Sequence, residues 1–410
     1  MQATTESKRA IAARDLRVLP LVERAKRIAP ILSQQAAACE AAGKLTQDTL
    51  DALRSERLLS FWLPRCFGGD EAMPLDSLEA IETLCRADGS IGWVVMAAQA
   101  AMGTAAAFLA PSAAKLIFGE GAPIIAGQGQ PNGKASIESG GYRLHGRWAY
   151  GSGTLHAEYV HTGAAVYLDG KPRLKPGSTL PEAKIFIVPI RDVKLLGNWD
   201  TLGLRATGSV DYAIDGAHVP EEFTHGFMTK LPNQGGDLYR LGISGFSAIA
   251  HSAFAFGVAR RALDELAAIG AGERPPSIMS PPGSETFHHK YAHAEATLRA
   301  VRALGFEVWV DAQKTIERGN PLSVRQSTLA RLVVNHATTV ASDITSFAFR
   351  YAGGIGTRYG TLQRCFRDMQ TGAQHATASP LILGECGREL LGLHPTKIWG
   401  FRSLIDPQDA

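Results

Sequence analysis

The chain has 410 residues, of which 45% are hydrophobic and 20% are charged, and its formal net charge is +3. A chain of this length and composition is expected to form two or three domains with a sizeable core. The small net charge, without any run of Lys or Arg, argues against a nucleic-acid-binding protein and against binding to a membrane surface.

The cysteines and the N-terminal residues give no sign of secretion. The five cysteines are scattered and contain no CxxC pair, so we expect neither a disulfide framework nor a zinc site. The first residues, "MQATTESKRAIAARDLR", have no apolar core and no cleavage signature, so we expect no signal peptide. The default location is the cytoplasm.

Residues 20 to about 120 have apolar positions at helical spacing, with Thr46 as a candidate cap and Gly43 as a candidate stop. Within this segment, Ile91 to Ala110 contains no charged residue over twenty positions, which is long enough to span a bilayer. The stretch is rich in alanine, contains Gln99 and Thr104, and lacks flanking basic clusters. We therefore predict a helix buried inside the protein and no membrane span.

From about Pro123 to Pro232, short β-rich runs are separated by Gly, Pro, Asn and Asp, which is typical of an antiparallel β-domain. "GRWAYGSGTLHAEY", residues 146–159, is its densest segment. Its rings and its small hydroxyl are able to receive a flat aromatic ligand, but residue chemistry alone favours a hairpin with a packed aromatic face. "NWDTLGLRATGS", residues 198–209, indicates only a loop.

From Leu238 onward, long helical patterns return and predict a four-helix bundle. The order helices, β-segment, helices does not match a Rossmann domain. The glycine clusters "GQGQPNG" and "GGIGTRYG" also miss the GxGxxG spacing, so a nucleotide cofactor would have to bind in another way.

The histidines differ in what they indicate. His288, His289 and His293 include an i,i+4 pair, but no third ligand is near, so we expect a solvated helix face and no metal. His251 and His336 lie in apolar helical patterns and are expected to be hydrogen-bonded core residues. In "RCFRDMQTGAQHATASP", residues 364–380, a histidine, His375, stands where no carboxylate follows Asp368.

Three segments together resemble the acyl-CoA dehydrogenase superfamily: "LLSFWLPRCFGGDE", "GVARRALDEL" and "YAGGIG…CFRDM". The resemblance implies an α+β fold with an N-terminal helical domain (1–122), a middle antiparallel β-barrel (123–235) and a C-terminal four-helix bundle (236–410). It also implies a homotetramer, and a flavin held between the β-domain and the bundle, partly by a neighbouring subunit.

The chain departs from the dehydrogenases at both of their base positions. Ala376 stands where these enzymes commonly have a glutamate, next to His375, and residues 244–261 contain no Asp or Glu. Abstraction of a proton beside a thioester would then have no agent. "GRWAYGSG", "GLRATGS" and "RDMQTGAQH" instead resemble the flavin-dependent monooxygenases of this superfamily. These are oxygenase components of two-component aromatic hydroxylases and related enzymes, which receive reduced flavin from a separate reductase.

That resemblance implies roles for individual residues. His375 stands at the position of the catalytic histidine, as a general base or to orient the peroxide. Ser152 matches the hydroxyl that hydrogen-bonds flavin N5 and steadies the C4a-hydroperoxide. Trp148 and Tyr150 would line the flavin site, and Trp93 would lie near the substrate, although a core tryptophan explains Trp93 equally well.

The resemblance also implies a group of residues at the phosphate end of the cofactor. In this group Arg274 is one position out of register, and Arg350 replaces a usual glutamine. The members are Arg274, Arg350, Gly353 and Gly354.

The sequence as a whole predicts a flavin-dependent monooxygenase that uses reduced FMN or FAD and O₂ to oxygenate a small aromatic substrate. Its expected partners are a flavin reductase and the substrate, with no nucleic acid, membrane or metal. Two alternatives stay open: an acyl-CoA dehydrogenase or nitroalkane-type flavin oxidase, and a non-catalytic assembly protein on the same fold.

Overall fold

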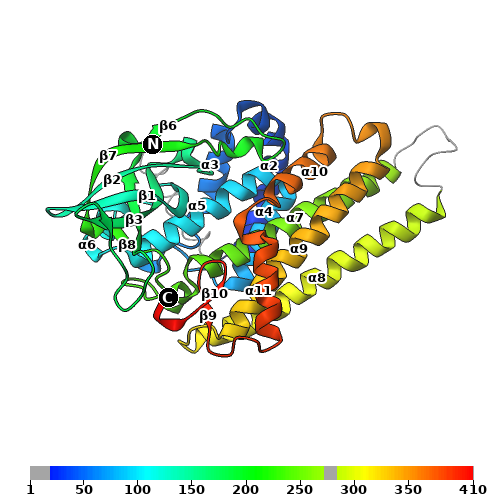
Figure 1. Cartoon of the computed structure of the whole chain (residues 1–410). Helices are drawn as coiled ribbons and strands as arrows, with labels where there is room; N and C mark the ends of the chain where they lie inside the picture. The colour runs from blue at the N-terminus through cyan, green and yellow to red at the C-terminus, as the bar shows by residue number, and fades with distance from the viewer. Residues whose placement is uncertain (1–18, 272–283, 410) are drawn as a thin grey trace.

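The computed structural model describes residues 19–271 and 284–409. Its first part is helical (Figure 1). Thr46 accepts a hydrogen bond from the Thr49 backbone N–H at the start of α3, and Gly43 ends α2 with φ 65°, so both expected signals are confirmed. The helices are α2 (Leu21–Ala42), α3 (Gln47–Ser55), α4 (Pro74–Ala87), α5 (Gly89–Phe108) and α6 (Pro111–Phe118).

The α5 helix lies at the centre of the molecule. Every residue of α5 except Ala97 is buried, and Asp88 caps it by accepting from the Ile91 N–H (3.1 Å). Two segments are long and apolar enough to cross a membrane, Gly89–Phe108 and Asp237–Gly270, but 94% and 83% of their most apolar windows are buried within the protein. The expectation of a buried helix is confirmed.

The middle of the chain forms one sheet with the strand order β6-β7-β2-β1-β3-β5-β8, and β4 pairs with β3. The predicted antiparallel barrel is wrong in two respects. The pairing of β1 with β3 is parallel, because the chain crosses back after β2 before it re-enters the sheet beside β1. Across the described residues, the sheet also ends at β6 and β8 without closing. The strands are β1 (Ile125–Glu138), β2 (Gly141–Trp148), β3 (Tyr159–Leu168), β4 (Lys171–Pro172), β5 (Ala183–Pro189), β6 (Lys194–Leu195), β7 (Tyr212–Pro220) and β8 (Thr224–Gly226).

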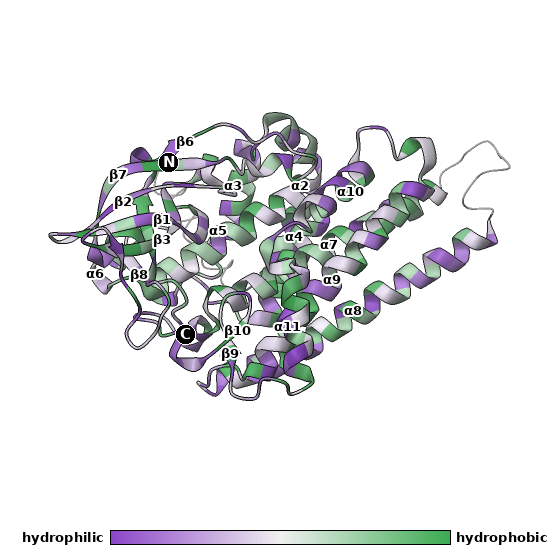
Figure 2. Cartoon of the chain, viewed as in Figure 1, coloured by the Kyte–Doolittle hydropathy of each residue, from purple (hydrophilic) through white to green (hydrophobic). Residues whose placement is uncertain are grey.

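The last part is helical again and ends in a short hairpin (Figure 1). One continuous hydrophobic core joins it to the N-terminal helices, with α4 packed on α7. In Figure 2, α8 alternates between purple and green along its length, in keeping with the single buried face that runs from Phe287 to Ile316. The elements are α7 (Gly242–Ala271), α8 (Glu285–Glu317), α9 (Val324–Tyr351), α10 (Thr361–Gly372), α11 (Pro380–Leu390), β9 (Ile398–Trp399) and β10 (Leu404–Ile405).

Histidines on α8 and α9 lie on the surface of the protein, away from α5. His288, His289 and His293 are exposed on α8, and no group of three metal-ligating side chains occurs within 19–271 and 284–409. The prediction of a core position for His336 is wrong, because the side chain is exposed on α9. Its neighbours Asn335 and Ala337 are buried, and one helical step of about 100° turns His336 out of the buried face.

Candidate active site

A cavity of about 1090 Å³ lies where α5, the sheet, the 198–209 loop and the C-terminal helices meet. Its walls come from α5, β1, β3, β5, β8, α7, α10 and the segment that follows α10, so no single domain of the sequence builds it. The volume is at the upper end of the range for small-molecule sites, which leaves space for a fused ring system and a second ring. None of the described residues on its walls is Asp or Glu; the groups that can carry charge are Arg402 and four histidines.

Trp93, on α5, connects the two polar sides of this cavity. Its Nε1–H donates to the hydroxyl of Ser152 (3.0 Å). Its ring makes edge-to-face contacts with the rings of His251 and His375, with centroid distances of 5.2 and 5.7 Å. Trp93 is only 6% exposed. It is therefore a core residue and a cavity wall at once, and it fixes the distance between the serine and the histidines.

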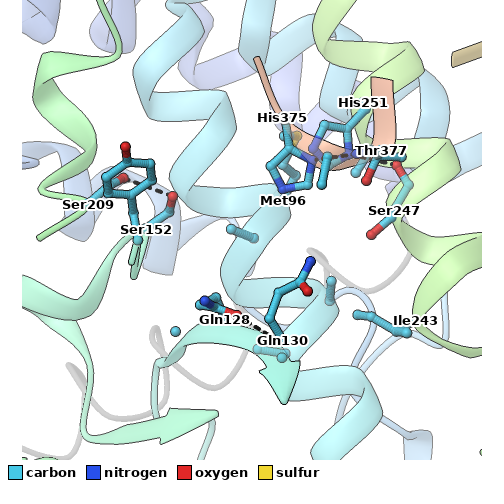
Figure 3. A pocket seen from close by; sticks show the side chains of 18 of the residues that line it. Met96, Gln128, Gln130, Ser152, Ser209, Ile243, Ser247, His251, His375 and Thr377 are labelled. Atoms are coloured by element: carbon cyan, nitrogen blue, oxygen red, sulfur yellow. Dashed lines mark hydrogen bonds between the residues drawn. The ribbon is translucent and has the colours of Figure 1, made fainter. Parts of the chain in front are cut away.

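Ser152 follows β2, where Gly153 turns the chain with φ 82°. Its oxygen accepts from Trp93, and the hydroxyl of Ser209, on the 198–209 loop, lies 2.8 Å away. Ser209 in turn lies 2.6 Å from the Thr207 hydroxyl, which donates to the Leu204 carbonyl, so Ser152 is the cavity end of a row of hydrogen-bonded hydroxyls. Figure 3 shows Ser152 and Ser209 on one side of the cavity and the two histidines on the other.

His375 and His251 stack on each other, with ring centroids 4.2 Å apart and planes at 27°. The backbone N–H of Thr377 donates to Nδ1 of His375 (3.2 Å), so the proton of the neutral ring lies on Nε2. His251 has the opposite arrangement. Its Nδ1–H donates to the Ser247 carbonyl (2.8 Å), and its buried Nε2 has no partner within the described chain.

Both rings are neutral near neutral pH. Burial lowers the pKa of His251 to about 4. Burial, the neighbouring His251 and the positive charge of Arg402 hold the pKa of His375 well below its usual range. The His375 side chain is exposed by surface area, but protein atoms surround the ring, and its accessible surface lies on the cavity wall.

A second pair of histidines lines the cavity from the sheet. His161 on β3 and His225 on β8 are 4% and 7% exposed. Burial lowers their pKa values to about 3 and about 4. Nδ1 of His161 and Nε2 of His225 are buried, and neither has a hydrogen-bond partner among the described residues. No sequence signal marked this pair, because each histidine lies in an ordinary strand and only the sheet order brings them together.

Residues 249–380 match the model of the acyl-CoA dehydrogenase C-terminal domain. An indole-3-acetate monooxygenase from Pseudomonas putida is 31% identical over 360 residues, which cover 86% of this chain and 88% of that protein. The oxygenase subunit of a flavin-dependent monooxygenase, HsaA of Rhodococcus jostii, is 26% identical over 88% of this chain and 94% of its own. The chain belongs to the flavin-dependent monooxygenases of the acyl-CoA dehydrogenase superfamily.

Solved structures share the fold of this monooxygenase. A 3-HSA hydroxylase from Rhodococcus superposes with a TM-score of 0.83 at 23% identity, covering 91% of this chain and 97% of that one. XiaF from Streptomyces, in complex with FADH₂ and glycerol, gives the same TM-score and identity, with 95% and 98% covered. The acyl-CoA dehydrogenase-like fold is thereby established, with its mixed α and β content.

Of the aromatic residues predicted for the flavin site, the structure places one on the cavity wall of the monooxygenase. Tyr150 lines it, is 60% exposed, and meets Trp199 edge-on at 5.1 Å. Trp148 does not line the cavity. It is fully buried in the sheet, stacked on Tyr212, with its Nε1–H donating to the Gly163 carbonyl (2.8 Å). The packed aromatic face considered for this hairpin accounts for Trp148 but not for Tyr150.

Three of the residues predicted for the phosphate end of the cofactor lie away from the cavity. Arg350, Gly353 and Gly354 are exposed at the C-terminal end of α9 and do not line the cavity of this chain. The fourth, Arg274, lies outside the described residues.

Arg367 and Asp368 of α10 have a structural role that the sequence did not indicate. Asp368 accepts from the Leu204 backbone N–H (2.6 Å), and Arg367 donates to the Leu202 carbonyl (3.1 Å). Both bonds hold the 198–209 loop against α10. Since Ser209 on this loop hydrogen-bonds Ser152, the pair acts on the site from a distance.

Proposed function

We propose that this monooxygenase is the oxygenase component of a two-component system. It would take reduced FMN or FAD from a separate reductase and use O₂ to oxygenate a small aromatic substrate. Relatives named as an oxygenase subunit and as the oxygenase component of a resorcinol hydroxylase support the reductase partner. The names indole-3-acetate monooxygenase and resorcinol hydroxylase support an aromatic substrate. Structures of similar fold in complex with FADH₂ or FMN support the cofactor.

The observation that carries this proposal is the cavity lining. It combines the Ser152 hydroxyl with two neutral imidazoles, His251 and His375, and has no carboxylate among the described wall residues. A dehydrogenase needs a base that removes a proton from carbon, and a carboxylate usually serves. This lining is better suited to orienting neutral groups by hydrogen bonds.

The residues present fit a flavin ring. The exposed Tyr150 ring, the Ser152 hydroxyl and the Gln128 side chain all line a cavity large enough for three fused rings. Gln128 is itself held by a bond from its amide to the Ala149 carbonyl (3.1 Å). When bound, reduced flavin supplies the electrons that activate O₂ for transfer of one oxygen atom to the substrate.

The protein's own residues would hold the reactants and keep water out. The Ser152 hydroxyl would hydrogen-bond the cofactor from one side of the cavity, and His375 would donate its Nε2–H from the opposite side (Figure 3). Because Nδ1 of His375 already accepts from Thr377, this tautomer favours the donating, orienting role over that of general base. Apolar side chains such as Met96, Ala100 and Ile243 make up much of the remaining wall and limit the access of water.

The quaternary arrangement is part of the proposal. α7, α8, α9 and α10 would form the four-helix bundle of the 236–410 domain, and the bundles of four copies would pack together as a homotetramer. The exposed group Arg350, Gly353 and Gly354 would then contact the cofactor of a neighbouring subunit, a role that we propose for Arg274 as well. The 1–122 and 123–235 domains would complete each subunit, and the protein would work in the cytoplasm.

The proposal is tested by supplying the cofactor already reduced. Under anaerobic conditions the protein is mixed with chemically reduced FMN or FAD and an aromatic substrate such as indole-3-acetate or resorcinol, and then with isotopically labelled O₂. We expect one labelled oxygen atom in the product, and we expect NADH alone not to reduce the bound flavin at a useful rate. Rapid reduction by NADH without a reductase, or bleaching of oxidised flavin by acyl-CoA or nitroalkanes, would contradict the proposal.

A further inference from the structure

We propose that His251 is the hydrogen-bond acceptor that selects the substrate: its Nε2 binds a ring N–H or O–H donor of an aromatic compound. This inference rests on the proposed function and adds the chemical class of substrate and a specificity-determining residue. His251 lies on α7, its ring stacks on the ring of His375, and both rings line the cavity.

The proton of His251 is assigned by its partner. Ser247 offers a backbone carbonyl at 2.8 Å from Nδ1, and a carbonyl oxygen only accepts. Nδ1 therefore carries the hydrogen, and Nε2 of the neutral ring has a lone pair. The tautomer follows from this one hydrogen bond, because the acceptor is a backbone carbonyl of the same helix, α7.

The lone pair of Nε2 is left without a donor from the described chain. Nε2 is buried, and the whole His251 side chain is only 8% exposed. Buried polar atoms in folded proteins nearly always have a partner, and an unsatisfied one costs free energy. Ile243, Ser247 and Ala250, on the same helix, line the cavity with His251, so the missing donor would come from a molecule bound there.

His375 supplies the complementary group. Its Nε2 carries the proton, since its Nδ1 accepts from Thr377. The two stacked rings therefore offer one acceptor and one donor, and Trp93 meets both of them. A phenolic hydroxyl, which donates and accepts, can use both rings, and an indole or pyrrole N–H can use His251 alone.

The acceptor persists over the working pH range. Burial lowers the pKa of His251 to about 4, so its lone pair is not lost to protonation near neutrality. The positive and titratable groups at the pair are Arg402 and His375, and Arg402 opposes protonation of the adjacent His375. The described residues of this wall include no carboxylate that could accept the proton of such a ligand instead.

The test compares ligands that differ only in the donor. Binding of indole and 1-methylindole, and of phenol and anisole, is measured by calorimetry with the full-length protein and three variants. His251→Phe keeps a ring in the stack but removes the lone pair, and His251→Gln restores an acceptor. His336→Gln, on the exposed side of α9, is the matched control.

We expect the wild type and His336→Gln to bind the donor ligands about 10-fold to 100-fold more tightly than the methylated ones. This preference should fall to about twofold or less in His251→Phe and return in part in His251→Gln. A wild type that does not distinguish the members of each pair would overturn the proposal without reference to any variant. A preference that survives in His251→Phe would do the same.

A separate measurement distinguishes failure of the role of His251 from failure of the monooxygenase function. Wild-type protein with chemically reduced flavin and labelled O₂ is assayed for oxygenated product. If product forms while His251→Phe still distinguishes indole from 1-methylindole, the role of His251 is wrong and the monooxygenase function stands. If no aromatic compound is oxygenated, the proposed function fails as well.

Discussion

At the scale of single residues, the site depends on the side chain of Trp93. It donates to Ser152 on one side and meets both cavity histidines on the other. The indole N–H can only donate, so it occupies one lone pair of Ser152 and holds the hydroxyl at the cavity wall. The position of the serine thus depends on a residue from α5, far from it in the sequence.

Removing the Ser152 hydroxyl should affect coupling more than folding. A single neutral hydrogen bond contributes about 0.5–1.5 kcal/mol, which corresponds to about tenfold at most in a rate. We expect Ser152→Ala to release more H₂O₂ per reduced flavin and to form less product, with an unchanged melting temperature. An unchanged ratio of product to H₂O₂ would mean that the Ser152 hydroxyl only stabilises the hairpin and does not contact the cofactor.

His375→Ala separates a catalytic from a structural role. As a cap, the imidazole accepts one backbone N–H, and its loss should cost stability by no more than about 1 kcal/mol. As the donor that orients the reacting groups, it should affect the oxygenation step by about 10²–10³-fold. Product formed per reduced flavin consumed is the measurement. Equal coupling in wild type and variant, with only a small loss of stability, would leave His375 as a cap.

At the scale of elements, the site depends on how closely the 198–209 loop approaches α10. A Cβ on Gly203 would lie 2.1 Å from the Arg367 carbonyl oxygen and 2.5 Å from the Asp368 backbone nitrogen. The glycine permits this approach, and the bonds of Arg367 and Asp368 to the loop depend on it. The loop places Leu204 and Ser209 on the cavity wall.

Gly203→Ala should therefore disturb the site from outside it. The methyl group has no space, and overpacking of this kind costs about 1–3 kcal/mol. We expect a lower free energy of unfolding and weaker binding of reduced flavin. Gly384→Ala is the control: its Cβ meets nothing within 4 Å on α11, so stability should stay the same or rise slightly. Equal effects of the two substitutions would contradict this account.

At the scale of the whole molecule, the cavity is formed where the sheet and both helical segments meet, and it keeps several imidazoles out of water. Burial lowers the pKa of His161 to about 3 and of His225 and His251 to about 4, against about 6.5 in an unfolded chain. Between pH 6.5 and about 4 the unfolded chain therefore binds protons that the folded protein does not. Asp368, whose pKa burial raises to about 7, has the opposite effect, but it is one group against these three histidines together with His156, whose pKa burial lowers to about 4, and His375, whose pKa is also lowered.

The free energy of unfolding should therefore be nearly constant between about pH 7 and 8 and fall as the pH drops from about 6.5 toward 4. Each buried histidine contributes at most about 1.4 kcal/mol per pH unit in this window. Urea unfolding at several pH values measures the slope. His161→Gln should reduce the slope and the exposed control His336→Gln should not; a slope that His161→Gln leaves unchanged would refute the assignment.

The sequence by itself determined the local features whose causes are local. The cap at Thr46, the stop at Gly43 and the buried α5 helix follow from residue type and spacing, and the family followed from several short segments. His375 and Ser152 could be named because they lie inside such segments. Both then line one cavity, as does Trp93.

Only the tertiary structure decided what depends on strand order and on contacts between distant segments. Strand alternation could not distinguish Trp148, which faces the core of the sheet, from Tyr150, which faces the cavity. The parallel pairing of β1 with β3 is set by how the chain crosses back, and periodicity does not record it. His251 was correctly predicted to be buried and hydrogen-bonded. Its second nitrogen and its stacking on His375 became visible only when α7 and the segment after α10 were placed side by side.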